Sequence, residues 1–472
     1  MLDITDLTIK SASDLLRSKQ IKAKELTESF IERAYSLNEK LNCYITLTPE
    51  YAKAQAQKVD DLIADNQQIP PLAGIPIAIK DLFSTSGIKT TAASKVLEDY
   101  VPVYDATVVT KLKSSNAVFV GKTNLDAWAH GSSGENSDFG NTKNPFDQKR
   151  VPGGSSAGSA AALAASTCLV ATGTDTGGSI RLPASFCNLV GLKPTYGRVS
   201  RYGVIAMASS LDSIGHFTKT VYDNALVLNT TAGLDNFDAT TSPQKVDDYT
   251  KDIEKGVKNL KIGLPKEYFE GLNSEIKGLI MEAVKKLQSL GAEVVDVSLP
   301  YTEHGVATYY IIQPSEVSSN LARYDGIRFG NDRTNFAAEA KRRIMLGTFT
   351  LSSGYYDAYY LKAMKVRKLV REDFLKAFQE VDVLICPTSP TPPFKLGEKS
   401  SDPMEMYLSD VYTVTVNLAG VPSLAIPCGF LDNLPIGMQI IGPDFSEKLL
   451  YQMGYAYEQE TKWYRQKPKI NG

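Results

Sequence analysis

Short apolar runs alternate with longer amphipathic segments along most of the 472 residues. The apolar runs have the length of strands, and segments between them, such as 274–290 and 355–380, have apolar positions at helical spacing. Such alternation favours strands that are joined and covered by helices. We therefore predict an α/β fold with a mixed central β-sheet flanked by helices. The expected strands are Leu72–Ile79, Ala117–Val120, Cys168–Thr172, Leu260–Leu264, Ala292–Val297, Val381–Cys386, 423–428 and 436–441.

The chain contains no point at which it divides naturally. No linker rich in Pro, Gly or Ser interrupts it, and no segment repeats another. We therefore expect one large domain over residues 1–472, with a core at about 70–220 and a helical insertion at about 300–380. Near the N-terminus, residues 22–40 have apolar positions at helical spacing, and Ser11 is placed to cap a shorter helix before them.

Composition and charge exclude several classes of protein. The net charge is -2 at pH 7, without the basic excess that unaided binding to nucleic acid phosphates requires. No apolar run reaches the ~18 residues of a membrane span. The first residues, MLDITDLTIK, lack the basic and apolar segments of a signal peptide. We therefore expect a cytoplasmic protein with no membrane attachment.

The cysteines give no sign of a metal site or of a disulfide framework. They are scattered, odd in number and form no CxxC pair. We expect buried, reduced thiols and no bound metal. The five residues are Cys43, Cys168, Cys187, Cys386 and Cys428.

The most unusual local composition is a pair of segments, GGSSAGSAAALAAS at 153–166 and ATGTDTGGSIRLPAS at 171–185. The first predicts a glycine-serine turn that leads into an alanine-rich helix. The second follows an apolar strand and turns through Asp175–Gly178, where successive backbone N–H groups can point at one anion. Ser179 then stands in the position of a nucleophile. A structural glycine turn with solvent-facing serines explains the composition equally well.

Two other motifs fail on their context. The GKT at 121–123 has Asn116 where a phosphate-binding loop requires glycine. An SxxK pattern at 86–89 lacks its companion motifs.

A serine–histidine hydrolase is also poorly supported. The GSSAG at 154–158 matches the GxSxG elbow, but the residues before it have the composition of a loop rather than of a strand. The elbow also needs a histidine partner, and no histidine has a context that marks it as a base. The candidates are His130, His216 and His304.

Lysine can take the place of histidine as the base. Lys80 ends the apolar run LAGIPIAIK, so the tip of a buried strand would hold its amine in a dry environment. Desolvation disfavours the ammonium and lowers the pKa of lysine, as a base working near neutral pH requires. Taken alone, a solvated lysine at a strand end explains Lys80 as well.

Taken together, these segments resemble the amidase signature family. GGSSAGSAAALAA and GTDTGGSIRLPASFCNLVGLKPTYGRVSRYG carry the two-part signature, with a separation of 24 residues between Ser155 and Ser179. The resemblance extends from GIPIAIKD at 74–81, through GKTNLDAWAHGSSGENS at 121–137 and SSLDSIG at 209–215, to PIGMQIIG at 435–442. It therefore covers nearly the whole chain.

This resemblance implies a serine amidase with the fold of that family. Ser179 would be the nucleophile, Lys80 the base and Ser155 the bridge between them, held across a cis Gly154–Ser155 peptide. Neither a metal nor a cofactor would be needed in this chain. The oxyanion of the tetrahedral intermediate would be bound by backbone N–H groups, those of Thr176, Gly177 and Gly178.

Within the family, KRRIMLGTFTLSSGYYDAYYLKAMKVR at 341–367 and MYLSDVYTVTVNLAGVPSLAIPCG at 406–429 are most similar to the A subunits of glutamyl-tRNA(Gln) amidotransferases. That branch implies glutamine as the substrate. Its α-carboxylate would bind Arg343 and its α-ammonium Asp410, while Tyr310 would line the pocket. The stretch between residues 330 and 341 is shorter than in the family.

The same resemblance implies a complex with B and C subunits. This chain would release ammonia from glutamine, and the B subunit would use ATP and Mg to activate the glutamate of Glu-tRNA(Gln) and accept the ammonia. The C subunit would hold the two together, and the tRNA would be engaged through the complex. The alternative is a stand-alone amidase that hydrolyses a small or aliphatic amide with the same Ser-Ser-Lys triad.

Overall fold

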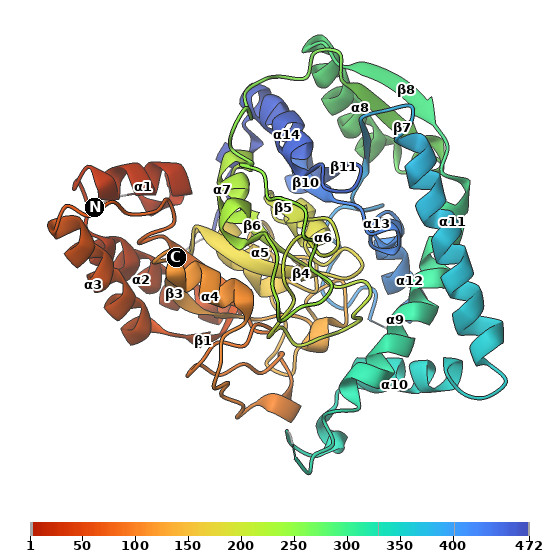
Figure 1. Ribbon diagram of the computed structural model, residues 1–472, viewed down its shortest axis with the longest axis horizontal. Helices are drawn as coiled ribbons and strands as arrows, with labels where there is room; N and C mark the ends of the chain where they lie inside the picture. Colours follow the sequence, from red (N-terminus) through yellow and green to blue (C-terminus); the bar gives the residue numbers. More distant parts are fainter. Residues whose placement is uncertain (1–2, 329, 401, 471–472) are drawn as a thin grey trace.

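The computed structural model describes residues 3–328, 330–400 and 402–470, and an 11-stranded sheet runs through them (Figure 1). β2 pairs in parallel with β3 and β4, and β7 pairs in parallel with β8 and β9, whereas the remaining pairs are antiparallel. The predicted mixed α/β sheet is therefore confirmed. In order across the sheet the strands are β1 (Tyr44–Leu47), β3 (Val118–Thr123), β2 (Pro76–Lys80), β4 (Val170–Asp175), β6 (Ser213–Thr218), β5 (Val190–Lys193), β10 (Ser423–Leu431), β11 (Leu434–Ile441), β9 (Val383–Pro387), β7 (Lys261–Pro265) and β8 (Glu293–Val297).

Every strand expected from the sequence is present, with ends that differ by a few residues. The largest difference is at β2, which begins at Pro76 because residues 71–74 form a turn. Three strands were not expected: β1, β5 and β6. They are short or contain glycine and polar residues, so their sequences lack the apolar runs by which the others are recognised.

Helices cover both faces of the sheet. Gly437 of β11 faces Ser185 of α6, whereas Leu424 of the adjacent β10 faces Gly454 of α14. On the α14 side lie α7, α14 and α8, which contact one another in a row, and on the other side lie α5 and α6. Their bounds are α5 (Ala157–Ala164), α6 (Arg181–Phe186), α7 (Val221–Thr231), α8 (Ser274–Ser289) and α14 (Glu447–Thr461).

Further helices cover the two ends of the sheet (Figure 1). Beside β3, at the N-terminal end of the chain, lie α1 (Ile9–Arg17), α2 (Ala23–Leu41), α3 (Pro49–Ala64) and α4 (Thr107–Ser114). On the opposite side lie α9 (Gly305–Leu321), α10 (Ala338–Thr350), a π-helix (Tyr356–Leu361), α11 (Lys362–Ala377), α12 (Pro403–Tyr407) and α13 (Val414–Ala419).

Helices α9 and α10 pack unusually closely. A Cβ added at Gly347 would lie 1.8 Å from the carbonyl oxygen of Pro314, so only glycine allows this approach. The contact brings Arg343, one turn before Gly347, against Gln313, one residue before Pro314. The close packing of the two helices therefore positions a buried arginine.

The prediction for Ser11 was wrong. Thr8 is the N-cap of α1, and Ser11 lies inside the first turn, where its hydroxyl accepts a hydrogen bond from the Thr8 N–H at 2.9 Å. The two side chains thus form a reciprocal capping box. The cysteine prediction is confirmed, since all five thiols are free and buried. Among the described residues no helix combines the length and the apolar character of a transmembrane segment.

Candidate active site

The site forms where two neighbouring parallel strands end. Lys80 is the last residue of β2 and Asp175 the last residue of β4, and carboxyl ends of parallel neighbours share one edge of a sheet. The backbone N–H of Lys80 donates to the Thr172 hydroxyl at 2.9 Å, which fixes the two strand ends to each other. The turn after β4 and the loop before α5 meet at this edge.

Lys80 is fully buried, and its ammonium has three hydroxyl partners. Its Nζ lies 2.9 Å from Ser155 Oγ, 2.9 Å from Ser156 Oγ and 2.7 Å from Thr174 Oγ1. Burial lowers the pKa of Lys80 to about 7, because no carboxylate in the described structure bonds to the ammonium directly. More distant buried carboxylates oppose this shift, those of Asp126, Asp175 and Asp212.

Ser155 follows a cis peptide bond from Gly154, as the resemblance implied. A Cβ at Gly154 would lie 2.0 Å from Asp126 Oδ2, so glycine is required there. Asp126 in turn accepts hydrogen bonds from the N–H groups of Gly134 and Asn136. The buried carboxylate therefore holds the loop that presents Ser155 to Lys80. The loop character of the residues before Gly154, which argued against a GxSxG elbow, is confirmed.

Ser179 is 7% exposed, and its hydroxyl has no hydrogen-bond partner among the described residues. Its carbonyl oxygen accepts from the Ser156 N–H at 3.3 Å, which ties the two serine-bearing segments together. Within residues 3–328, 330–400 and 402–470 no hydrogen bond joins the hydroxyls of Ser155 and Ser179. The structure thus brings Lys80 and Ser155 into contact and leaves the Ser179 hydroxyl free beside them.

The turn before Ser179 differs in one respect from the prediction. The N–H of Gly178 donates to Asp175 Oδ1 at 2.9 Å, so it is not available to an oxyanion. The N–H groups of Thr176, Gly177 and Ser179 have no acceptor in the described part of the chain. Gly178 is needed for its shape: its φ is +137°, and a Cβ there would lie 2.4 Å from Thr413 Oγ1.

A buried ion pair fixes this turn. Both guanidinium contacts from Arg181 to Asp175 are 3.0 Å long, and each residue is completely buried. Burial alone would raise the pKa of Asp175, but Arg181 lowers it to about 2. Nη1 of Arg181 donates to Gln439, and Nη2, which also contacts Asp175, lies within hydrogen-bond distance of Asn417 and the Thr413 carbonyl. Because each of the three guanidinium nitrogens has a partner, the turn is held rigidly.

The three predicted substrate-binding residues lie together. The Tyr310 hydroxyl donates to Asp410 Oδ2 at 2.9 Å, and the guanidinium of Arg343 lies 5.1 Å from the Tyr310 ring centre. Ser132 also donates to Asp410, at 2.8 Å. Burial raises the pKa of Asp410 to about 6, although these hydrogen bonds and Arg343 oppose the shift. The structure therefore places a cation and an anion close to the same tyrosine.

Arg343 is already engaged within the chain. Its Nε donates to Glu339 at 2.7 Å and its Nη1 to Gln313 at 2.7 Å. The guanidinium lies 5.1 Å from the ring centre of Tyr310 and 5.5 Å from that of Tyr407. The second terminal nitrogen, Nη2, has no acceptor among the described residues, so it can bind an external carboxylate. The stack of Tyr310 on Tyr407, with ring centres 3.7 Å apart, holds the guanidinium plane in place.

Comparison with known proteins identifies the family. A family model described as Amidase matches residues 25–451. The chain belongs to the amidase signature family. It is therefore an enzyme of amide chemistry, and its fold is the one seen in solved structures of that family.

The relatives of this amidase include the A subunit of glutamyl-tRNA(Gln) amidotransferase from Carboxydothermus hydrogenoformans, 52% identical over 485 aligned residues, 99% of this chain and 100% of that one. The crystal structure of the subunit of the same name from Thermotoga maritima has a TM-score of 0.86 and 42% identity, and the match covers 100% of this chain and 99% of that one. The peptide amidase from Stenotrophomonas maltophilia also has a TM-score of 0.86, at 30% identity and with 100% of both chains covered. Backbone similarity alone does not separate the two activities.

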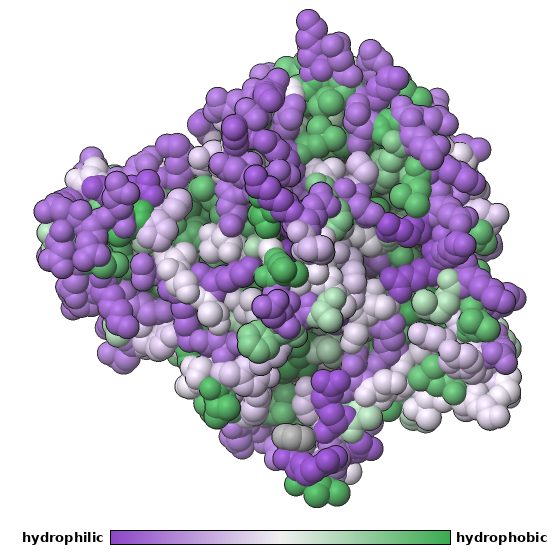
Figure 2. Space-filling model, in the orientation of Figure 1, coloured by the Kyte–Doolittle hydropathy of each residue, from purple (hydrophilic) through white to green (hydrophobic). Residues whose placement is uncertain are grey.

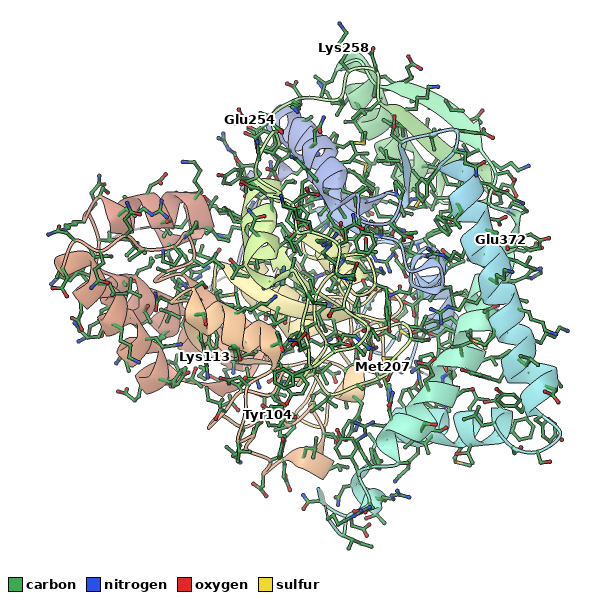
Figure 3. The ribbon with its side chains drawn as sticks, viewed as in Figure 1. Tyr104, Lys113, Met207, Glu254, Lys258 and Glu372 are labelled. Carbon is green, nitrogen blue, oxygen red and sulfur yellow. The ribbon has the colours of Figure 1, made fainter. Side chains whose placement is uncertain are left out.

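Two neighbouring cavities lie in the amidase, and one of them reaches Thr174, which binds the Lys80 amine. The first, of about 200 Å³, is lined by Thr174 and Met207 among others, and the second, of about 630 Å³, by Tyr104. Figure 3 labels Met207 and Tyr104. The cavities share the wall residues Val204, Ile205, Ala206 and Arg323, so they adjoin each other.

Several residues of the site were not found from the sequence. Ser156 and Thr174 bind Lys80, and Ser132 binds Asp410. Each lies inside a segment that carried the resemblance, but the segment does not say which of its hydroxyls faces the amine or the carboxylate. Of the excluded motifs, the GKT lysine Lys122 is buried in β3 and pairs with the buried Asp81 at 3.2 Å.

Proposed function

We propose that this amidase hydrolyses glutamine and supplies the ammonia that converts Glu-tRNA(Gln) to Gln-tRNA(Gln). The observation that carries the proposal is the placement of Arg343 and Asp410 around Tyr310. Glutamine carries an α-carboxylate and an α-ammonium on one carbon, and a cation and an anion held one tyrosine apart match that pair. A simple amide has neither charge and would leave both buried groups without an external partner.

The arrangement of the three predicted catalytic residues supports an acyl-enzyme route. Neutral Lys80 accepts a proton from Ser155, which accepts one from Ser179, and Ser179 Oγ attacks the amide carbon. Free N–H groups at Thr176, Gly177 and Ser179 bind the oxyanion. The proton returns along the relay to the amide nitrogen, and the C–N bond breaks to release ammonia. Water then adds to the ester carbon, and Ser179 leaves with a proton to give glutamate.

The released ammonia needs a second chain to use it. We assign that step to a B subunit that binds ATP and Mg and activates the glutamate on tRNA, with a C subunit that joins the two. Relatives that align over the full length are named as the A subunits of an amidotransferase, and this name supports the assignment. We place the reaction in the cytoplasm, in keeping with five unpaired thiols.

An exposed aromatic surface is where we place the contact with a partner chain. Phe349 of α10 and Tyr355 lie 4.2 Å apart between ring centres, and both are exposed at the tip of the α10–α11 hairpin. Figure 2 shows hydrophobic residues among paler, less hydrophobic ones at the lower right, where this hairpin lies. Exposed Lys362 and Lys365 follow it along α11, so two copies of the chain would bring like charges together here and an acidic-rimmed partner fits better. The surface comprises Met345, Leu346, Phe349, Tyr355, Tyr356, Tyr359 and Leu361.

Ammonia release distinguishes the proposal from a stand-alone amidase. The purified chain is assayed alone and with its B and C subunits on glutamine, glutaric acid monoamide, which lacks the ammonium, and 4-aminobutanamide, which lacks the carboxylate. We expect glutamine to be used best and its turnover to rise with the subunits. Equal use of all three amides, unaffected by the subunits, would favour the stand-alone amidase. Phe349→Ser should weaken assembly without changing the glutamine KM of the isolated chain.

A further inference from the structure

Tyr309 of α9 is a tyrosine that neither the sequence motifs nor the relay above uses. Its side chain is 3% exposed and packs over the oxyanion turn: a Cβ built on Gly177 would lie 2.7 Å from the Tyr309 hydroxyl oxygen and 2.7 Å from the ring carbon that bears it. Gly177 is one of the residues whose N–H has no acceptor in the described chain. The phenol therefore lies next to the group that would bind the oxyanion.

The hydroxyl of Tyr309 has no hydrogen-bond partner among the described residues. Its neighbour Tyr310 differs, since that hydroxyl donates to Asp410 at 2.9 Å. Other buried hydroxyls without a partner, such as that of Tyr249, are sealed from solvent, whereas the Tyr309 oxygen retains some access. A phenol that is almost buried and reaches accessible space has a donor to offer to a ligand.

The electrostatic surroundings keep this hydroxyl protonated. Burial raises the pKa of Tyr309 well above its usual value, and Asp410, Asp212 and Asp175 raise it further, while Arg343 acts in the opposite direction. The group is therefore a donor and not a base throughout the working pH range.

We propose that the Tyr309 hydroxyl donates a hydrogen bond to the oxygen of the scissile carbonyl, beside the Gly177 N–H, and strengthens this bond as Ser179 attacks. The inference rests on the proposed function, because it assumes that Ser179 is the nucleophile. The turn itself is fixed from behind: the Thr413 hydroxyl donates to the Gly177 carbonyl at 2.6 Å, which holds the peptide plane in place. The Tyr309 hydroxyl then adds a side-chain donor to the backbone N–H groups that would bind the oxyanion.

The test is Tyr309→Phe, which keeps the ring that packs on Gly177 and removes only the donor. We expect kcat for glutamine to fall about 100- to 1,000-fold with KM within about twofold, as for loss of one oxyanion donor. A γ-boronic-acid analogue of glutamine, which forms a tetrahedral adduct with serine, should lose affinity by a similar factor. The acid limb of the pH profile should not move, since Lys80 remains unchanged.

Two controls separate this role from packing. Tyr310→Phe removes the neighbouring hydroxyl from Asp410 and should raise KM more than it lowers kcat. Tyr451→Phe removes a buried hydroxyl on α14 that bonds to Asn224, away from the site, and should leave both constants unchanged. An unchanged kcat in Tyr309→Phe, a change in KM alone, or undiminished boronate affinity would overturn the proposal.

The outcome is also distinguishable from failure of the proposed function. If the wild-type chain uses another amide in preference to glutamine, the same kcat comparison applies to that amide and still tests Tyr309. If Ser179→Ala retains activity, the serine chemistry fails whatever Tyr309→Phe shows.

Discussion

The Nζ of Lys80 lies 2.7 Å from the Oγ1 of Thr174, across two neighbouring parallel strands. Two serine hydroxyls complete the contacts of the amine, and within the described structure none of its hydrogen-bond partners is a carboxylate. An ammonium with only neutral partners, sealed from water, loses its proton easily. The fold itself therefore sets the pH at which the base becomes available.

The pH dependence of catalysis follows from this environment. Lys80 has a pKa of about 7, and only its neutral form can accept the Ser155 proton. We expect kcat/KM for glutamine to rise with pH and to level off above about 7. This rising part of the profile, its acid limb, reports the pKa of Lys80 in the free enzyme. Initial rates from about pH 5.5 to about pH 9 measure it. A profile that is flat through neutrality would contradict the role of Lys80.

Thr174→Val should move that limb. The Thr174 oxygen accepts from the ammonium and so favours the charged form; valine keeps the shape and removes the acceptor. The pKa of Lys80 should fall, and the limb should shift to lower pH. Thr302→Val, at a buried threonine that bonds to the Leu299 carbonyl outside the site, is the matched control and should leave the limb in place. A shift of the acid limb to higher pH in Thr174→Val would contradict the claim that the Thr174 hydroxyl stabilises the charged form of Lys80.

Loss of either substrate-binding charge should impair only those amides that carry the matching charged group. Arg343→Ala and Asp410→Asn each remove one charge and should raise the glutamine KM about 10- to 100-fold, with a smaller change in kcat. Arg343→Ala should have little effect on 4-aminobutanamide, which lacks the carboxylate, and Asp410→Asn little on glutaric acid monoamide, which lacks the ammonium. If each variant impaired all three amides equally, the assignments would be wrong.

The pH dependence of KM provides a second check on Asp410. Its pKa is about 6, so protonation as the pH falls through that value removes the anion that the substrate ammonium needs. The glutamine KM should therefore rise below about pH 6 in the wild-type chain. In Asp410→Asn this rise should be absent.

The buried ion pair under the oxyanion turn should matter most for stability. Arg181→Met leaves Asp175 buried without its cation and should lower the free energy of unfolding by about 3–5 kcal/mol at neutral pH. Arg181 depresses the pKa of Asp175 to about 2, below its ordinary 3.8, so the stabilisation is present above pH 3.8 and is lost as the pH falls toward 2. Urea unfolding at several pH values should show the difference between variant and wild type narrowing in acid. A difference that does not depend on pH would point to lost packing instead.

Much of the fold could be predicted from the sequence because the central strands are buried on both faces. A strand such as β2 is apolar up to its last residue, Lys80, and the alternation of such strands with amphipathic helices specifies the class of fold. Strand β6, SIGHFT, is equally buried but lies between two antiparallel neighbours with glycine and polar residues in its sequence. No local pattern identifies such a strand; the sheet around it does.

The candidate site divides in the same way. Lys80, Ser155 and Ser179 could be named because two short segments and one strand end carry them in a recognisable order. Gly178 was assigned wrongly as a donor, since nothing in the sequence shows that the Asp175 side chain takes its N–H. Tyr309 was missed because only the packing of α9 against Gly177 gives it a neighbour in the site. Contacts between distant segments are what the sequence leaves open.

Trapping of the acyl-enzyme tests the central claim most directly. The chain is mixed with glutamine and quenched in acid within the first turnovers, and the masses of its proteolytic peptides are measured by mass spectrometry. The Ser179→Ala variant is treated in the same way. The account predicts a γ-glutamyl group on the wild-type peptide that contains Ser179, released by hydroxylamine, and no adduct or ammonia release in Ser179→Ala. Ammonia release from glutamine that continues in Ser179→Ala, or a γ-glutamyl group found on another residue, would contradict it.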